Sequence, residues 1–173
     1  MALLDILIHP DPRLKKPSAP VAAVTPALRA LAADMFQTMY AAPGIGLAAP
    51  QVGMMQRLIV VDCIKDKDAA PRPIAMLNPE VTWSSDERSI YDEGCLSIPE
   101  QYGEVERPAA VEVRWHDLDM VAHSERFDGL WATCVQHEID HLEGKLFIDY
   151  LRPLRRQLIT RKMVKLKRER MRA

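Results

Sequence analysis

The sequence lacks the features of a secreted or membrane protein. No apolar run approaches the ~20 residues that a helix needs to cross a bilayer, and the apolar N-terminus is interrupted by Asp5 and has no basic segment before it. The three cysteines, Cys63, Cys95 and Cys134, are an odd number in a chain without an export signal. A disulfide framework is therefore not expected, and we expect a cytoplasmic protein with no membrane partner.

Negative charge is almost absent from the end of the chain. Residues 151–173 hold ten Lys and Arg and one acidic residue, a net charge of +9, whereas residues 1–150 have a net charge of −10. Aromatic residues are absent after Tyr150, which leaves phosphate contacts, but not base stacking, as a means of binding nucleic acid. The basic segment is thus either a solvated helix or an arm that binds a polyanion.

The rest of the composition is that of one globular domain. The chain has 173 residues, of which 48% are hydrophobic and 27% charged, and it contains no internal repeat. Thr25 and Pro26 form a helix start, and Pro43 with Gly44 marks its end. Five further segments have strand-like or helical patterns: strands at 58–61, 74–77 and 111–115, and helices at 130–143 and 153–172. This order predicts an α+β fold.

A metal site is predicted by His137, Glu138 and His141, which form an HExxH pattern. Residues four apart share a face of a helix, so both imidazoles can bind one ion. The glutamate between them can then act as a general base on a water, as in hydrolytic metal sites.

A third protein ligand is needed, because a catalytic site generally has three and an open position. Phe147 stands where a downstream third histidine would be expected. Cys95 is the preferred candidate, because Gly94 before it permits close backbone approach. Cys63 and Cys134 are more typical of small buried residues, although the residues alone leave them open as ligands.

A glycine-containing loop at residues 44–49 formally matches a dinucleotide-binding pattern. The context disfavours that function, because the loop follows a predicted helix and is itself followed by Pro50. Gln51 at its end offers a neutral amide that can stabilise a developing oxyanion.

The sequence resembles bacterial peptide deformylases of type I. Three motifs of that family occur in order: GxGLAAxQ at residues 44–51, EGCLS at 93–97 and HExDH at 137–141. The resemblance covers essentially the whole chain. It implies an α+β fold of mostly antiparallel sheets packed around the central HExxH helix. Residues 1–150 are then a catalytic domain, and residues 151–173 are a basic C-terminal helix of the same domain.

The resemblance implies that Cys95, His137 and His141 bind one divalent metal ion. In the family this is usually Fe2+, with Ni2+, Co2+ or Zn2+ able to occupy the same site. The family removes the N-formyl group from the initiator methionine of new polypeptides and releases formate. These substrates are N-formylmethionyl nascent peptides, so a ribosome near its exit tunnel is an expected partner of the basic helix.

The resemblance also assigns the catalytic roles. Metal-bound water or hydroxide attacks the formyl carbon while Glu138 acts as general base and then as general acid. The charge on the former carbonyl oxygen is met by the metal, the Gln51 side chain and the Leu96 backbone N–H. The peptide adds as a strand beside the loop that contains Gly44.

The methionine side chain and peptide need a binding pocket, which the resemblance also places. Its predicted members are Gly44, Ile45, Gly46, Tyr91, Glu93, Leu130, Thr133 and Cys134. Leu130, Thr133 and Cys134 share a helix face with His137, which supports the assignment independently, although such a stripe can also be simple core.

Four residues are candidates for orienting the metal ligands: Glu93, Arg107, Gln136 and Asp140. Arg107 could pair with Glu93 in a buried network, and a surface position for Asp140 is equally compatible with the sequence. Two other functions stay open on the residues alone. They are a different HExxH metallohydrolase, such as a small peptidase, and a non-enzymatic metal domain that binds ribosomes. We expect a monomer.

Overall fold

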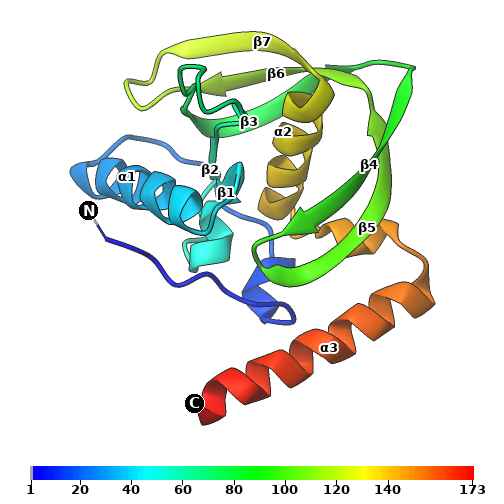
Figure 1. The fold of residues 1–173 in the computed structure, drawn as a ribbon. Coiled ribbons are helices and arrows are strands. Elements are labelled where there is room, and N and C mark those ends of the chain that lie inside the picture. Colours follow the sequence, from blue (N-terminus) through cyan, green and yellow to red (C-terminus); the bar gives the residue numbers. More distant parts are fainter. Residues whose placement is uncertain (1) are drawn as a thin grey trace.

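Two antiparallel sheets enclose a central helix in the computed structural model, which describes residues 2–173 (Figure 1). The α-helices are α1 Pro26–Ala41, α2 Gly129–Leu142 and α3 Pro153–Arg172, and the short 3-10 helices are η1 Pro12–Lys15, η2 Ala49–Val52 and η3 Phe147–Tyr150. The strands are β1 Gly46–Ala48, β2 Leu58–Val61, β3 Ile74–Ser84, β4 Arg88–Cys95, β5 Ile98–Pro108, β6 Ala110–His116 and β7 Ala122–Asp128.

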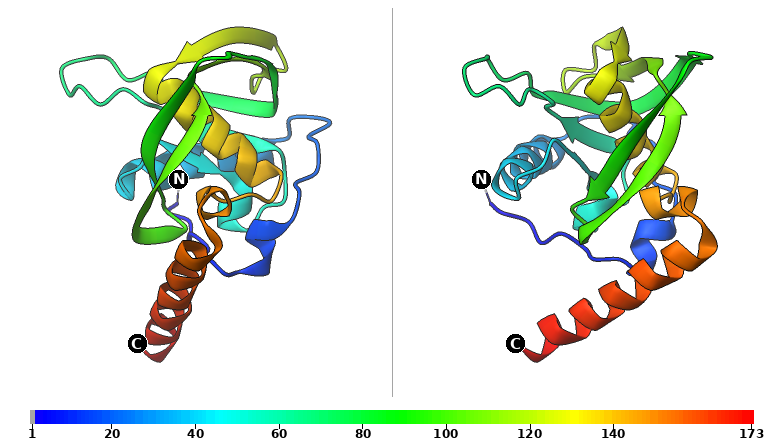
Figure 2. Two further views of the ribbon diagram at one scale, coloured as in Figure 1. Left: turned by 90° about the vertical axis from the view of Figure 1, so that its right-hand side faces the viewer. Right: turned by 45° about the vertical axis from the view of Figure 1, so that its right-hand side comes forward.

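The larger sheet has the order β1-β2-β3-β6-β7, and β4 pairs only with β5. The β4-β5 hairpin stands on the opposite side of α2 from the larger sheet (Figures 1 and 2). The prediction of an α+β fold with mostly antiparallel sheets around the HExxH helix is confirmed.

The larger sheet is covered on both faces, which explains the continuous apolar run of β2. Ile59 and Val61 pack in one core cluster with residues of α2. Leu58 and Val60 point the other way, into a second cluster with residues of α1. A strand that alternates between two buried faces needs apolar residues at every position.

Helix α1 begins where its sequence predicts. The Thr25 side chain accepts a hydrogen bond from the backbone N–H of Leu28 at 3.1 Å, and Pro26 occupies the first helical position. Helix α2 ends before Gly144, which has φ +77°. A side chain at Gly144 would lie 2.6 Å from the Lys15 carbonyl oxygen, so both conformation and space require glycine there.

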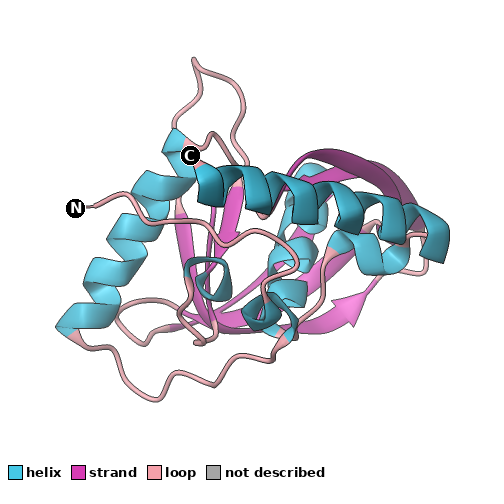
Figure 3. Ribbon diagram, turned by 90° about the horizontal axis from the view of Figure 1, so that it is seen from below, coloured by secondary structure: helices cyan, strands magenta, loops and turns pink. Residues whose placement is uncertain are grey.

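Helix α3 is the most exposed of the helices. Of its side chains only Ile159 and Met163 are buried, in a cluster with Leu14, Ile98 and Phe147. The helix projects from the body and crosses its underside (Figures 2 and 3). No helix within residues 2–173 is both long and apolar enough to span a bilayer.

Candidate active site

The three predicted metal ligands come together from two elements. His137 and His141 lie one turn apart on α2, and Cys95 is the last residue of β4. One ligand atom from each lies within 4.8 Å of the other two. The register between β4 and β5 shifts after Gly94, which turns the end of the strand toward α2.

This donor set fits a transition-metal ion. The Cys95 Sγ lies 3.4 Å from His141 Nε2, close to the ~3.6 Å that bond lengths to zinc imply for a sulfur and a nitrogen on one tetrahedral centre. A thiolate with two imidazoles is a ligand set of borderline softness. The Nδ1 of His141 is buried without a hydrogen-bond partner among the described residues.

His137 is oriented by a buried carboxylate. Its Nδ1 lies 2.9 Å from Glu93 Oε1, which leaves Nε2 directed toward Cys95 and His141. Arg107 holds that carboxylate, because its Nε and Nη2 donate to the two Glu93 oxygens at 2.7 and 2.9 Å. Such a carboxylate–histidine pair fixes the tautomer and direction of a metal-binding imidazole.

The network continues to the outer side of α2. Arg107 Nη1 donates to Asp140 Oδ2 at 2.8 Å, and the Tyr150 hydroxyl donates to the same oxygen at 2.7 Å. The guanidinium also lies over the Tyr150 ring, 4.7 Å from its centroid. Asp140 therefore joins the network instead of standing free on the surface.

The charges of this network oppose the effect of burial on pKa. Burial alone would raise the pKa of Glu93, but hydrogen bonds from His137 and Arg107 hold it below its ordinary value. Burial alone would lower the pKa of His137, but Cys95 and Glu93 raise it well above its ordinary value. A metal ion binds only the neutral imidazole of His137, so the affinity for metal depends on pH.

Glu138 lies beside the candidate ligands without joining them. Its Oε1 is 4.0 Å from His137 Nε2 and 3.8 Å from His141 Nε2, and the residue is 2% exposed. Burial raises the pKa of Glu138 to about 7. A carboxyl group near neutrality can both accept and return a proton, as general acid–base catalysis requires.

Gly46 makes room for this carboxylate. A Cβ at Gly46 would lie 2.8 Å from Glu138 Cγ and 2.9 Å from Cys134 Sγ. Real Cβ atoms essentially never approach so closely, so β1 can pass over α2 at this distance only with glycine.

Gln51 is 1% exposed and reaches the same site from η2. Its Oε1 accepts from the Ala48 N–H at 2.9 Å, and its Nε2 donates to Ser97 Oγ at 3.0 Å and to Cys95 Sγ at 3.5 Å. The accepting bond fixes the amide so that its donor end faces the thiol.

Comparison with known proteins identifies the family. The family model for polypeptide deformylase matches residues 3–157. A peptide deformylase of Rhizorhabdus wittichii is 55% identical, with 98% of each chain covered. The chain belongs to the polypeptide deformylase family.

Solved structures of deformylases share the whole architecture. The peptide deformylase of Legionella pneumophila is 43% identical with a TM-score of 0.90, and the match covers 99% of each chain. A class I type b peptide deformylase of Acinetobacter baumannii with Met-Ala-Ser bound is 36% identical, with a TM-score of 0.81 over 86% of this chain and 98% of that one. Members of the family are hydrolases that remove the N-formyl group from polypeptides, so this chain is a hydrolase and the non-enzymatic alternative is wrong.

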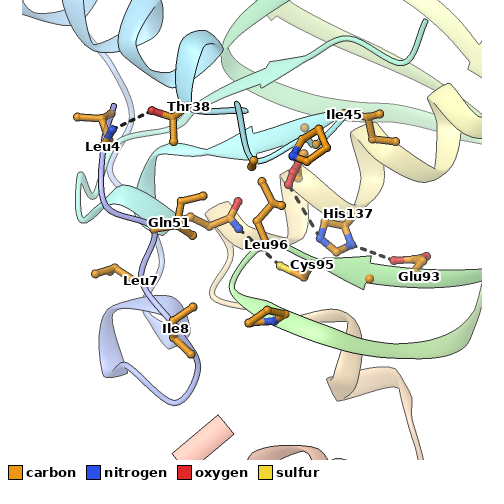
Figure 4. A pocket seen from close by; sticks show the side chains of 18 of the residues that line it. Leu4, Leu7, Ile8, Thr38, Ile45, Gln51, Glu93, Cys95, Leu96 and His137 are labelled. Carbon is orange, nitrogen blue, oxygen red and sulfur yellow. Dashed lines mark hydrogen bonds and ion pairs between the residues drawn. The ribbon is translucent and has the colours of Figure 1, made fainter. Parts of the chain in front are cut away.

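The deformylase motifs meet at a cleft of about 1240 Å³ (Figure 4). The predicted pocket residues Gly44, Ile45, Gly46, Tyr91, Glu93, Leu130, Thr133 and Cys134 all line this cleft, as do Gln51, Cys95, Leu96, His137 and Glu138. His141 does not line it and is 1% exposed.

Some placements differ from the sequence-based expectations. Gln136 does not orient a metal ligand, because its amide donates to the backbone oxygens of Pro108 and Ala132. Ser97 and Tyr150 are additional members of the site that the sequence analysis missed. The only signal for Ser97 was its place in the EGCLS motif, and nothing in the local sequence indicates Tyr150.

Proposed function

We propose that this chain hydrolyses the N-formyl group of formyl-methionine at the start of new polypeptides, with Cys95, His137 and His141 holding one divalent metal ion. The observation that carries the assignment is the approach of these three donors within 4.8 Å beside a buried carboxylate. The family match over residues 3–157 supports the reaction and disfavours a peptidase.

The ion is Fe2+ in the cell, and Ni2+, Co2+ or Zn2+ can replace it. One thiolate and two imidazoles suit all four ions, so availability and geometry decide between them. When bound, such an ion supplies Lewis acidity, which lowers the pKa of a water and polarises the formyl carbonyl.

Glu138 moves the proton. It accepts a proton from the attacking water and returns it to the leaving amine, which its raised pKa of about 7 favours in both directions. The Nε2 of Gln51 and the backbone N–H of Leu96 donate to the oxygen on which negative charge develops. Loss of one such donor typically lowers kcat by about 10²–10³.

The substrate binds as an added strand. β1 is an edge strand of the larger sheet, and a peptide can pair with such an edge while alternate side chains enter pockets. The methionine side chain enters the cleft between Ile45 and the face of α2 that holds Leu130, Thr133 and Cys134. The Met-Ala-Ser bound to the Acinetobacter baumannii relative supports a peptide of this kind.

Formate release from formyl-Met-Ala-Ser tests the function, with protein prepared anaerobically with Fe2+ or loaded with Ni2+. The Glu138→Gln variant keeps the shape of the side chain but cannot accept the proton, so release should fall by several orders of magnitude while metal content stays at one ion per chain. Metal-loaded, folded wild-type protein that releases no formate would overturn the proposal. Cleavage of unformylated Met-Ala-Ser would favour a peptidase.

The basic helix is proposed to bind the ribosome and to belong to the same domain as residues 1–150. Its outward face presents Arg161, Lys165, Arg168 and Arg172, all exposed, whereas its inward face inserts Ile159 and Met163 into the core. Deleting the helix would open that core. Charge reversal on the outward face is therefore the cleaner perturbation.

Sedimentation with ribosomes tests this docking. Binding by the wild-type protein should weaken between about 50 and about 200 mM salt, and Arg161→Glu/Arg168→Glu should weaken it at low salt. Ribosome binding that is unaffected by salt and by the charge-reversal variant would contradict an electrostatic contact. We also infer a cytoplasmic monomer, for which light scattering should give the 19.6 kDa mass of one chain.

A further inference from the structure

The deformylase cleft extends well beyond the groups assigned to catalysis. Its lining continues along the N-terminal segment, through Leu3, Leu4, Asp5, Leu7 and Ile8. Figure 4 shows Leu4, Leu7 and Ile8 on the side of the cleft opposite Glu93. The cleft ends at the C-terminal part of α3, which adds Lys167, Arg170 and Met171.

The inward face of α3 is apolar in the first part of the helix and basic toward its C-terminal end. Ile159 and Met163 are buried against the body. Lys167 and Arg170 follow at helical spacing and continue the same face, but they line the cleft instead of packing against protein. Arg161 and Arg168 point to the opposite side and do not line the cleft.

Lys167 and Arg170 form no close ion pair within the described residues. Within residues 2–173, no carboxylate lies within 4.0 Å of the side-chain nitrogens of Lys167 or Arg170. Asp11 also lines the cleft, and it is paired with Arg13, at 3.1 Å from Nε and 2.9 Å from Nη2. The hydrogen bond from Arg13 and, less strongly, the charge of Lys167 lower the pKa of the Asp11 carboxyl. Asp5 in the lining offsets one of the two charges, so this end of the cleft keeps an excess of positive charge.

We propose that this end of the cleft binds substrate residues downstream of the formyl-methionine and favours acidic side chains there. The inference rests on the proposed function and adds a substrate preference to it. The apolar wall of Leu4, Leu7 and Ile8 accepts aliphatic side chains of the same peptide, while Lys167 and Arg170 attract carboxylates. Opposite charges across a partly desolvated cleft raise the rate of productive binding.

Peptide length gives the inference a direct test. An extended chain advances about 3.3 Å per residue, so a tripeptide spans about 10 Å and an octapeptide about 26 Å. Two octapeptides that begin with formyl-Met-Ala-Ser and carry either Glu or Lys at positions 4 to 7 are compared by kcat/KM. The wild-type protein should prefer the acidic peptide about three- to fivefold, and the preference should shrink as salt rises.

Matched variants separate a local effect from net charge. Lys167→Glu/Arg170→Glu should reverse the preference, and Lys167→Gln/Arg170→Gln should abolish it without adding new repulsion. Arg161→Glu/Arg168→Glu changes the net charge of the same helix by the same amount, and it should keep the wild-type ratio. An unchanged ratio in both inward variants, or an equal change in the outward variant, would overturn the inference.

Turnover of the formyl-Met-Ala-Ser tripeptide distinguishes a failure of the deformylase function from a failure of the proposed charge preference. Tripeptide turnover with no charge preference among octapeptides overturns the inference and leaves the deformylase function in place. Absence of tripeptide turnover overturns the function and the inference together. Each variant's octapeptide rates are normalised to its own tripeptide rate, so a small loss of folded protein does not affect the ratio.

Discussion

Replacing Arg107 by Met should cost the protein much of its stability. The Arg107 side chain is 5% exposed and its partner Glu93 is 3% exposed. The substitution keeps an unbranched apolar stem, but it removes the guanidinium and with it both hydrogen bonds to Glu93 and the bond to Asp140. Removing one partner of a buried ion pair typically costs about 3–5 kcal/mol, because the remaining charge is left without compensation.

Thermal unfolding followed by circular dichroism measures this loss. In a protein of this size 1 kcal/mol corresponds to about 2–4 °C, so Tm should fall by about 6 to 20 °C. The matched control is Arg114→Met, which removes an ion pair with Glu80 at an exposed site and should cost less than about 1 kcal/mol. Equal, small losses in both variants would refute the description of the Arg107 pair as buried and essential.

Metal retention should change in the same variant. Glu93 orients His137 through the 2.9 Å contact, and loss of such an outer partner typically lowers metal affinity about 10- to 100-fold. Competition with a chelator measures that change. The double variant Glu93→Gln/Arg107→Met leaves no buried unpaired charge at position 93, so it should be more stable than Arg107→Met while still binding metal weakly. A double variant that regains full metal affinity would show that Glu93 does not position the ligand.

Three further predictions concern single sites. Gly46→Ala should lower kcat by at least tenfold at unchanged metal content, because the new Cβ would lie 2.8 Å from Glu138 Cγ; full activity would contradict this. Tyr150→Phe removes the hydrogen bond to Asp140 and should lower the free energy of unfolding by about 1 kcal/mol in denaturant titration. Burial and a neighbouring lysine lower the pKa of His9 from 6.5 to about 4, so the unfolded chain binds more protons between these values and stability falls as pH drops through them. Between pH 7 and pH 5 the wild type should lose about 2 kcal/mol more than His9→Gln.

The helices and strand β2 could be predicted from the sequence because their signals are local. Thr25 and Pro26 define the start of α1, and α3 spans Pro153–Arg172 as its spacing predicts. The apolar run of β2 coincides with its bounds, Leu58–Val61. Each of these signals arises from caps, helical spacing or burial on both faces, which a short window of sequence contains.

Strands β1, β4, β5 and β7 were missed, and for the last three the reason is that they lack such local signals. Most β4 residues and most β7 residues are exposed or half-buried, so neither strand has a clear apolar alternation. β5 contains Pro99, Gly103 and Pro108, which usually disfavour a strand. The hairpin is stabilised by pairing and by contacts with α2, not by the propensities of its own residues.

The candidate site was predictable where its residues form a local pattern, and not where they meet through long-range folding. The spacing of His137 and His141 fixes their common face on any helix, so that pair follows from local geometry. The choice of Cys95 depends on how a hairpin 42 positions earlier in the chain folds against α2; the preceding Gly94 made it the preferred cysteine, and the family motif decided between the three. The role of Asp140 depends on η3 returning Tyr150 to the same face, which no local pattern encodes.

The geometry of the site and the stability of the fold are linked through one side chain. Arg107 belongs to β5, yet it binds Glu93 on β4 and Asp140 on α2, so it holds the hairpin that carries Cys95 against the helix that carries the two histidines. A metal ion that joins the same two elements stabilises the same contact, by about 2.7 kcal/mol at a free concentration 100 times its Kd. Because the Arg107→Met variant should bind metal about 10- to 100-fold more weakly, metal stabilises it less than the wild type, and the loss measured with metal should exceed the 3–5 kcal/mol measured with a chelator by about 1–2 kcal/mol. A loss of the same size with and without metal would mean that Arg107 does not affect metal affinity, and the proposed link between the ion pair and the metal site would be wrong.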